Sequence, residues 1–323
     1  MITAEGSLQV PARDIPPPAS VSPEAKALLA LGPLEGPNYP SGDDVAEWQA
    51  VIAVMDELMR PMLVQRASQH AIDVDEIEAD GVRVFATSAD STAEGGHVYL
   101  QLHGGGFIIG GGECCRASAV DTAARVGKPV WAVDYRMPPT DPYPAALDDC
   151  ITAYRALLRL SRPEEIVIGG DSAGGNLAAS LILRARDEGL PLPAAAVLIS
   201  PELDLTESGD SFRANLGVDT VLTRSQMPAN LLYAAGHDLA HPYLSPLFGD
   251  VGQGFPPTLL ATGTRDLFLS NTVRMHRALR AAGVHADLHV FEAAPHGGFL
   301  GMAPEDAELD REVRRFVEAR LAD

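Results

Sequence analysis

The chain has 323 residues, a formal net charge of −20 and 46% hydrophobic residues. This length and composition are typical of a large α/β enzyme with a sizeable core. Because so many acidic groups repel phosphate backbones and anionic membranes, the charge argues against nucleic-acid binding and indicates a solvated acidic surface.

Cysteine content and the N-terminal sequence bear on location. The three cysteines, Cys114, Cys115 and Cys150, form no Cys-x-x-Cys pair and no disulfide framework, which indicates a reducing compartment. The N-terminus lacks the apolar core of a signal peptide, and no run approaches the roughly 18 apolar residues that span a bilayer. We therefore expect a cytoplasmic protein without a membrane span.

A helix is predicted after a proline-rich arm that covers residues 1 to about 20. From Asp44 onward, apolar residues recur in steps of three and four up to Leu63, which predicts one face of a helix. Asp44 and Glu47 resemble a capping box, with aspartate in the usual serine or threonine position. Pro61 is expected to kink or end this helix, because proline lacks the amide proton that a helix interior uses.

Strand signals begin near residue 71 and then alternate with helical patterns. The segments AIDVDEIEA and VRVFATS flank Asp80-Gly81 and predict a hairpin at a sheet edge. The alternation beyond them predicts a mostly parallel sheet with helices on both faces. Six further strands are predicted in HVYLQLH, PVWAVDY, EEIVIGG, AAAVLIS, TLLATGT and ADLHVFE, the last of which could end the sheet. The predicted helices cover about residues 113–126, Leu147 to Leu158, AGGNLAASLILRARDEG, a segment before the last strand, and the C-terminus.

The most informative motif is GDSAG, from Gly170 to Gly174. It fits the G-x-S-x-G nucleophile elbow and lies between a predicted strand and a predicted helix, which is the context that the motif requires. Small neighbours let Ser172 occupy a strained turn at the carboxyl end of the sheet. The N-terminus of the following helix favours developing negative charge, so Ser172 is the candidate nucleophile.

A serine nucleophile needs a base, and in this fold the chain order is serine, then an acid, then histidine. Asp266 follows the predicted strand TLLATGT, at a carboxyl end where ligand sites of open α/β sheets gather. His296 follows the last strand in a loop with Pro295 and Gly297. We therefore predict His296 as the base and Asp266 as the acid that orients it.

The glycine-rich stretch HGGG, which begins at His103, ends a strand upstream of the elbow. Motifs of this type supply the second half of an oxyanion hole, because bare backbone lets amide groups reach the oxygen that becomes charged. A phosphate site is not supported, since the stretch has no G-x-G-x-x-G pattern and the chain has no P-loop motif.

The segment HDLAH, from His237 to His241, mimics a zinc motif, but Gly236 and Pro242 disfavour a continuous helix there, so we expect no metal.

Several motifs together resemble the hormone-sensitive-lipase-like branch of the α/β-hydrolases over roughly residues 70 to 320. They are HGGGF, VDYR, YPAALDD, GGDSAGGN, SPELDLT, HPYLSPL and AAPHGGF. The resemblance implies an α/β-hydrolase fold with a helical cap and a carboxylic ester hydrolase that acts on short or medium acyl chains without a cofactor. By position, it implies Ser172 as nucleophile, His296 as base and Asp266 as acid. The implied oxyanion-hole residues are the amide donors Gly105, Gly106 and Ala173, with Gly104 shaping the loop and His103 orienting it.

Two departures from the family pattern are expected to alter pocket walls rather than the reaction. The family usually has Leu-Ala-Pro-Glu after DYR, where this chain has Met-Pro-Pro-Thr, and it favours Asp-Pro-Leu where this chain has Asp266-Leu267-Phe268. Lactones are an alternative substrate class on the same triad. A non-catalytic receptor, as in the plant gibberellin receptors that resemble this family but lack the histidine, is disfavoured because His296 is present.

The chain is expected to divide into residues 1–70, an arm with cap helices, and residues 71–323, the catalytic domain. Residues 205–250 interrupt the strand and helix alternation and are expected to form a cap insertion over Ser172. Open sheet edges are usually covered or paired, so the last strand predicts association of two subunits. The expected partner is otherwise a small-molecule ester.

Overall fold

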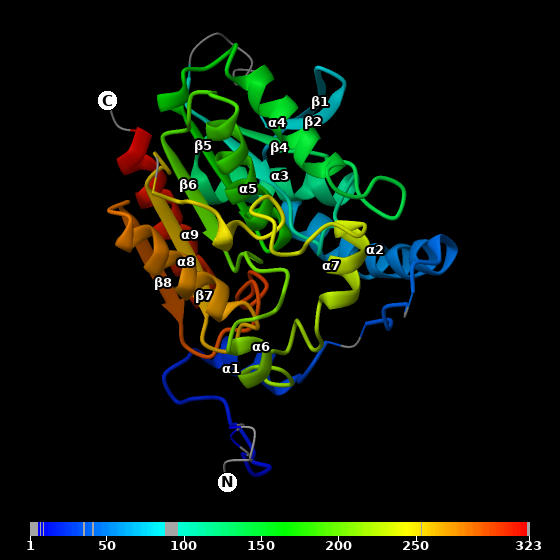
Figure 1. Ribbon diagram of the computed structural model, residues 1–323. Helices are drawn as coiled ribbons and strands as arrows, with labels where there is room; N and C mark the ends of the chain where they lie inside the picture. The colour runs from blue at the N-terminus through cyan, green and yellow to red at the C-terminus, as the bar shows by residue number, and fades with distance from the viewer. Residues whose placement is uncertain are drawn as a thin grey trace.

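The structure is a computed structural model of the 323-residue chain, and it describes residues 6, 8, 10–34, 36–40, 42–87, 96–252 and 254–321 (Figure 1). Its centre is an eight-stranded sheet in the order β1-β2-β4-β3-β5-β6-β7-β8, which confirms the predicted sheet. The strands are β1 Val74–Ala79, β2 Val82–Thr87, β3 Val98–Leu102, β4 Val130–Val133, β5 Ile166–Asp171, β6 Ala195–Ile199, β7 Thr258–Gly263 and β8 Ala286–Phe291.

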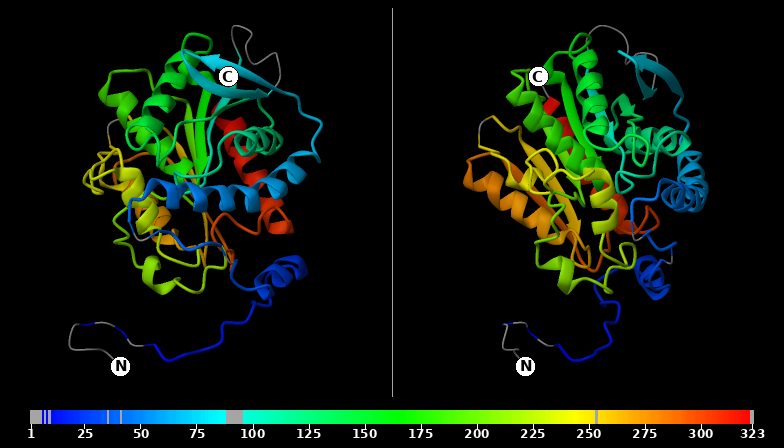
Figure 2. Two further views of the ribbon diagram at one scale, coloured as in Figure 1. Left: turned by 90° about the vertical axis from the view of Figure 1, so that its right-hand side faces the viewer. Right: turned by 45° about the vertical axis from the view of Figure 1, so that its right-hand side comes forward.

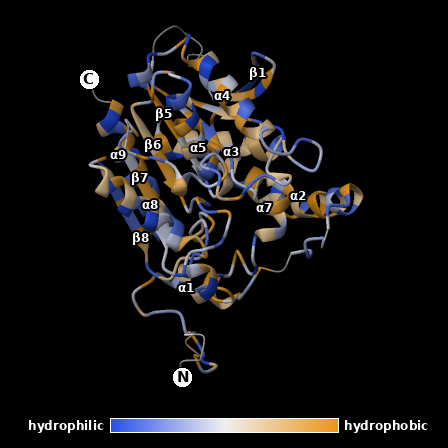
Figure 3. Cartoon of the chain, viewed as in Figure 1, coloured by the Kyte–Doolittle hydropathy of each residue, from blue (hydrophilic) through white to orange (hydrophobic). Residues whose placement is uncertain are grey.

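Strand direction follows the sequence pattern. The predicted hairpin is present, with β1 antiparallel to β2 and β2 antiparallel to β4, whereas the pairs from β4 to β8 are parallel. The central strands are apolar on both faces, as Figure 3 shows for β5 to β7, and parallel strands of this kind must be covered by helices on both sides. Strand β8 forms one edge of the sheet, as expected.

Helices cover both faces of the sheet. Helices α3 Glu113–Val126 and α9 Pro304–Leu321 pack against one face, and α4 Ala145–Leu157, α5 Ala173–Asp187 and α8 Leu269–Ala281 pack against the other. A short 3-10 helix, Pro163–Glu165, precedes β5. In the described part of the chain, every helix is too short or too polar to cross a membrane.

The N-terminal part differs from its sequence prediction at one proline. Helix α1 covers Pro23–Ala30, and α2 covers Val45–Ala67 as one long helix across the molecule (Figure 2). Pro61 lies inside α2 and does not end it, which corrects part of the expectation. Pro61 and Glu57 are both exposed, so water can hydrate the carbonyl that loses its helical partner. Of the predicted arm, residues 1–5, 7 and 9 lie outside the described residues.

The predicted insertion between β6 and β7 contains little regular structure. Its elements are α6 Ser211–Ala214, α7 Met227–Ala234 and the 3-10 helix Pro246–Phe248. The HDLAH segment follows α7 in turns, as expected from Gly236 and Pro242, so its two histidines are not presented on one helix.

Candidate active site

Ser172 occupies the sharp turn between β5 and α5. Its backbone angles are φ 56° and ψ −122°, a strained conformation for a residue with a side chain. A Cβ on Gly170 would lie 2.4 Å from the Gly174 carbonyl carbon, and one on Gly174 would lie 2.0 Å from the Leu102 oxygen. The turn therefore requires both motif glycines, and it presents Ser172 at the first turn of α5.

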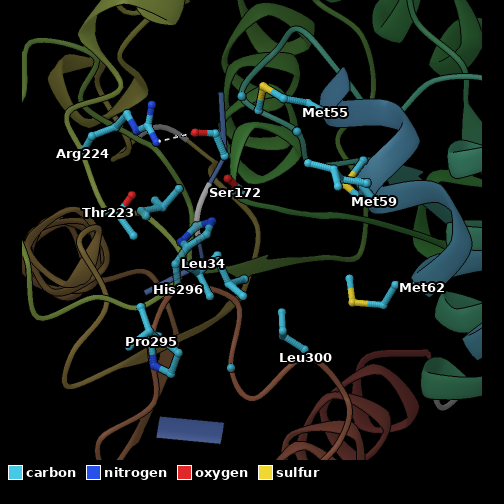
Figure 4. A pocket seen from close by; sticks show the side chains of 18 of the residues that line it. Leu34, Met55, Met59, Met62, Ser172, Thr223, Arg224, Pro295, His296 and Leu300 are labelled. Carbon is cyan, nitrogen blue, oxygen red and sulfur yellow. Dashed lines mark hydrogen bonds between the residues drawn. The ribbon is translucent and has the colours of Figure 1, made fainter. Parts of the chain in front are cut away.

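Ser172 and His296 line one cavity of about 650 Å³ (Figure 4). This volume is typical of small-molecule sites. Gly105 and Gly106 line the same cavity, so the structure brings the elbow, the HGGG loop and the candidate histidine together. Asp266 lies behind His296, where it is fully buried.

Asp266 and His296 are joined directly. The distance between His296 Nδ1 and Asp266 Oδ1 is 3.1 Å. Asp266 also accepts hydrogen bonds from Thr262 Oγ1 and the Phe268 amide, each 2.8 Å long. These bonds fix the carboxylate, which in turn fixes the imidazole ring and leaves its Nε2 to exchange a proton.

The pKa of Asp266 is lowered and that of His296 is raised. Burial alone would raise the pKa of Asp266, but the facing His296 and the hydrogen bonds that the carboxylate accepts lower it. Burial alone would lower the pKa of His296, but the carboxylates of Asp266, Asp219 and Glu202 raise it above its ordinary value. The pair therefore favours an ionised aspartate beside an imidazole that readily takes a proton.

The HGGG loop is held tightly against the elbow. Gly105 has φ 121°, and a Cβ there would lie 2.2 Å from the Ile109 oxygen. Gly104 faces the elbow, since a Cβ on it would lie 2.9 Å from the Asp171 oxygen. His103 Nδ1 lies 2.8 Å from the Gly104 oxygen, and its ring stacks on Tyr135 at 4.0 Å. The shaping role of Gly104 and the orienting role of His103 stay predictions. Ala173 is buried as the first residue of α5.

Sequence reasoning missed two buried acids beside His296. Asp219 accepts a hydrogen bond from the His296 amide at 3.3 Å. Glu202 lines the cavity, accepts a hydrogen bond from Asn230 at 2.8 Å, and has its pKa raised by burial to about 8. Glu202 lies within the SPELDLT motif, but Asp219 carries no motif signal, because its position becomes meaningful only once the loops pack together.

The opposite wall of the cavity comes from the N-terminal part and the insertion. Met55, Met59 and Met62 project from α2, and Thr223 and Arg224 lie across the cavity from them (Figure 4). Trp48 of α2 is buried in one cluster with Ile108 and Ile109 of the loop that follows HGGG, and with Ala229 of α7. Helix α2 therefore packs directly on the HGGG loop.

Several hydrogen bonds join the N-terminal part to the insertion. Arg224 donates hydrogen bonds to the carbonyl oxygens of Gly36 and Pro37, at 3.0 and 2.9 Å. Tyr39 donates to Gln226 at 2.9 Å. The wall opposite Ser172 is thus one continuous structure.

One group of described residues, His103, Cys115 and Asp134, has donor atoms within 4.8 Å of one another. Burial raises the pKa of the Cys115 thiol well above its ordinary value, which opposes the thiolate that a metal needs. Asp134 is already bound to the Gly112 amide at 2.9 Å and paired with Arg83. The chemistry of this group does not fit a metal site.

Comparison with known proteins agrees with this geometry. Residues 99–300 match a family model described as the α/β-hydrolase fold. An esterase of Acinetobacter venetianus is 33% identical over 245 residues, which cover 75% of this chain and 78% of the relative. The carboxylesterase/phospholipase LipF of Mycobacterium tuberculosis is 32% identical over 76% of this chain and 66% of its own length.

Solved structures agree as well. The crystal structure of an esterase superposes with a TM-score of 0.88 at 35% identity and covers 96% of this chain and 98% of its own. An esterase of the bacterial hormone-sensitive lipase family superposes with a TM-score of 0.79 at 30% identity, over 93% of this chain and 99% of its own. The predicted family and enzyme class are thereby confirmed. The chain belongs to the α/β-hydrolase fold family, within its hormone-sensitive-lipase-like branch of esterases.

Proposed function

We propose that the protein is a serine carboxylic ester hydrolase that uses Ser172, His296 and Asp266 through an acyl-enzyme intermediate. The observation that carries this proposal is the shared cavity: Ser172 stands on a strained turn in its wall, beside a histidine whose Nδ1 is hydrogen-bonded to a buried aspartate. This combination is the arrangement that nucleophilic acyl transfer needs.

The reaction follows from these positions. Ser172 Oγ attacks the ester carbonyl while His296 Nε2 takes its proton, and the amides of Gly105, Gly106 and Ala173 stabilise the oxyanion. His296 then returns the proton to the departing alcohol, which leaves an acyl group on Ser172. A water molecule, activated by the same imidazole, releases the acid and restores the serine.

The cavity supports a short to medium acyl group as the substrate's apolar part. Its lining is largely apolar and includes seven leucines and four methionines, and methionine side chains adapt to ligands of different shape. We assign α1, α2 and residues 205–250 to a cap that encloses this space, excludes water and limits substrate size. Lactones remain the alternative substrate class, because the same triad can open a cyclic ester.

The test is hydrolysis of chromogenic acetyl, butyryl and octanoyl esters, with a lactone panel beside them. Ser172→Ala and His296→Ala should each lower kcat by roughly 10⁴-fold or more, because triad members act as a unit. Wild-type kcat/KM should rise with pH through the raised pKa of His296 and be unchanged by chelators. A Ser172→Ala protein that keeps most of its activity would end the proposal.

Location and assembly remain proposals. The three cysteines are free and buried, which fits a cytoplasmic enzyme. Strand β8 forms an edge of the sheet, and we propose that two subunits pair there. A molecular mass in solution that stays at one subunit at all protein concentrations would contradict the pairing.

A further inference from the structure

Asp219 is a fully buried residue of the insertion, and its carboxylate accepts four backbone hydrogen bonds. Oδ1 accepts from the amides of Val221 at 2.8 Å, Leu222 at 3.1 Å and His296 at 3.3 Å. Oδ2 accepts from the Leu267 amide at 2.8 Å. The two local bonds fix the carboxylate on its own loop, and the other two reach outside that loop.

The two hydrogen bonds from outside the Asp219 loop come from the loops that carry Asp266 and His296. Leu267 directly follows Asp266, and the second bond reaches the backbone of His296 itself. Asp266 and His296 lie 30 residues apart, on loops that follow β7 and β8. One carboxylate of the insertion therefore bridges the backbones of both loops.

The bonding pattern indicates the ionised form of Asp219. Burial and the nearby Asp266 raise the pKa of Asp219, and the facing His296 lowers it. Four N–H donors surround the two oxygens, however, and hydrogen bonds from such donors favour the charged carboxylate over the protonated acid. The acidic groups that act on His296 are Asp266, Asp219 and Glu202, and Asp219 is the one that belongs to the insertion.

We propose that Asp219 is a positioning residue: it holds the Asp266 and His296 backbones at a fixed separation and so sets the hydrogen bond between their side chains. The role rests on the proposed function, because it acts through the triad. It also makes the insertion part of the catalytic geometry in addition to a cover over the cavity. Asp219 itself lies behind the two loops and touches no substrate in this role.

The first variant is Asp219→Asn, which keeps the shape of the side chain. One oxygen becomes an NH₂ group that cannot accept, so either the Leu267 bond or the bonds on the other oxygen are lost. We expect kcat to fall by about tenfold or more, the equivalent of one lost hydrogen bond, while KM changes by less than about twofold. Loss of the negative charge should also move the midpoint of the kcat/KM profile to lower pH.

A second variant separates charge from position. Asp219→Glu keeps the charge but displaces the oxygens, so kcat should fall while the pH midpoint stays near that of the wild type. The matched control is Asp204→Asn. Asp204 is an equally buried carboxylate of the same region, bound to Thr206, Ser208 and Arg274 rather than to the two loops. This control should lower the melting temperature and leave the pH midpoint in place.

A substrate-free readout keeps this proposal distinct from the proposed function. Wild-type protein should show a strongly downfield proton resonance for the His296 Nδ1–H bonded to Asp266, assigned by its loss in His296→Ala. The resonance should shift or broaden in Asp219→Asn and persist in Asp204→Asn. Activity retained by Ser172→Ala would refute the proposed function and leave this resonance unaffected.

Two results would overturn the role of Asp219. One is a folded Asp219→Asn protein with wild-type kcat, pH midpoint and resonance. The other is failure of both Asp219 variants to fold, which would make Asp219 a purely structural residue.

Discussion

The wall of the cavity that carries Ser172 and His296 is held by hydrogen bonds to buried groups, whereas the wall formed by α2 and residues 220–226 includes partly exposed apolar side chains of α2. On the first wall, Asp266 is fully buried. On the second, Leu58 is 62% exposed and Met62 is 37% exposed. The first wall fixes atoms in place, and the second adapts to what enters. Substitutions on the first wall should change the rate of chemistry, and substitutions on the second should change which ester is accepted.

The largest effect is expected from Asp266→Asn on the first wall. The amide NH₂ group would face His296 Nδ1 and favour the wrong tautomer, so kcat should fall by about 10³- to 10⁴-fold with an intact cavity. Steady-state kinetics with a butyryl ester measure this loss. Asp238→Asn, which affects an exposed turn, is the control and should keep wild-type activity. A loss of less than about tenfold would remove Asp266 as the orienting acid.

An intermediate and selective effect is expected from Met59→Trp on the second wall. The larger ring should fill the cavity, so kcat/KM for octanoyl esters should fall by about 10- to 100-fold while that for acetyl esters stays within about twofold. Val54→Trp is the matched control, because Val54 is a 49% exposed residue of the same helix outside the cavity lining. Equal losses on all acyl lengths would show that this wall does not select substrates.

The smallest effect on activity is expected from Glu202→Gln, a change at a buried residue of the cavity lining. Its pKa of about 8 means that Glu202 is mostly protonated at pH 7, so glutamine should change kcat/KM there by less than about twofold. The folded state binds this proton more tightly than the unfolded state, so wild-type stability falls as the pH rises from about 4.5 towards 8. Glutamine does not ionise, so the stability of the Glu202→Gln variant does not fall with pH for this reason.

Thermal unfolding at two pH values measures the difference. The melting temperature of Glu202→Gln should be close to the wild type at pH 5 and higher than the wild type at pH 8.5. If the melting temperatures of Glu202→Gln and the wild type differed by the same amount at both pH values, Glu202 would not titrate in this range.

The sequence predicted the first wall much better than the second. The elbow, the HGGG loop, Asp266 and His296 could be predicted from local chemistry: glycines that a side chain would replace only with a clash, or a polar residue at a strand end. Strands and helices of the sheet followed from their periodicity, and the boundaries of α3 matched the expected residues 113–126.

What the sequence did not predict depends on contacts between distant segments. Asp219 looks like any loop aspartate until the loops after β7 and β8 donate their amides to it. Pro61 was expected to kink or end α2, yet the helix continues through this exposed position, where water can hydrate the carbonyl that loses its partner. Neither outcome leaves a local pattern, since solvent exposure and long-range acceptors are properties of the folded chain.

The junction between the N-terminal part and the insertion uses main-chain acceptors and donors on one or both sides of several hydrogen bonds. Arg224 binds the carbonyl oxygens of Gly36 and Pro37, and the Leu34 amide donates to the Thr220 oxygen at 2.7 Å. Carbonyl groups are the same in every residue, so substitutions at Gly36 or Pro37 keep the acceptors that Arg224 uses, whereas a substitution of Arg224 removes both bonds. Side chains at positions 36 and 37 can therefore change while these bonds persist.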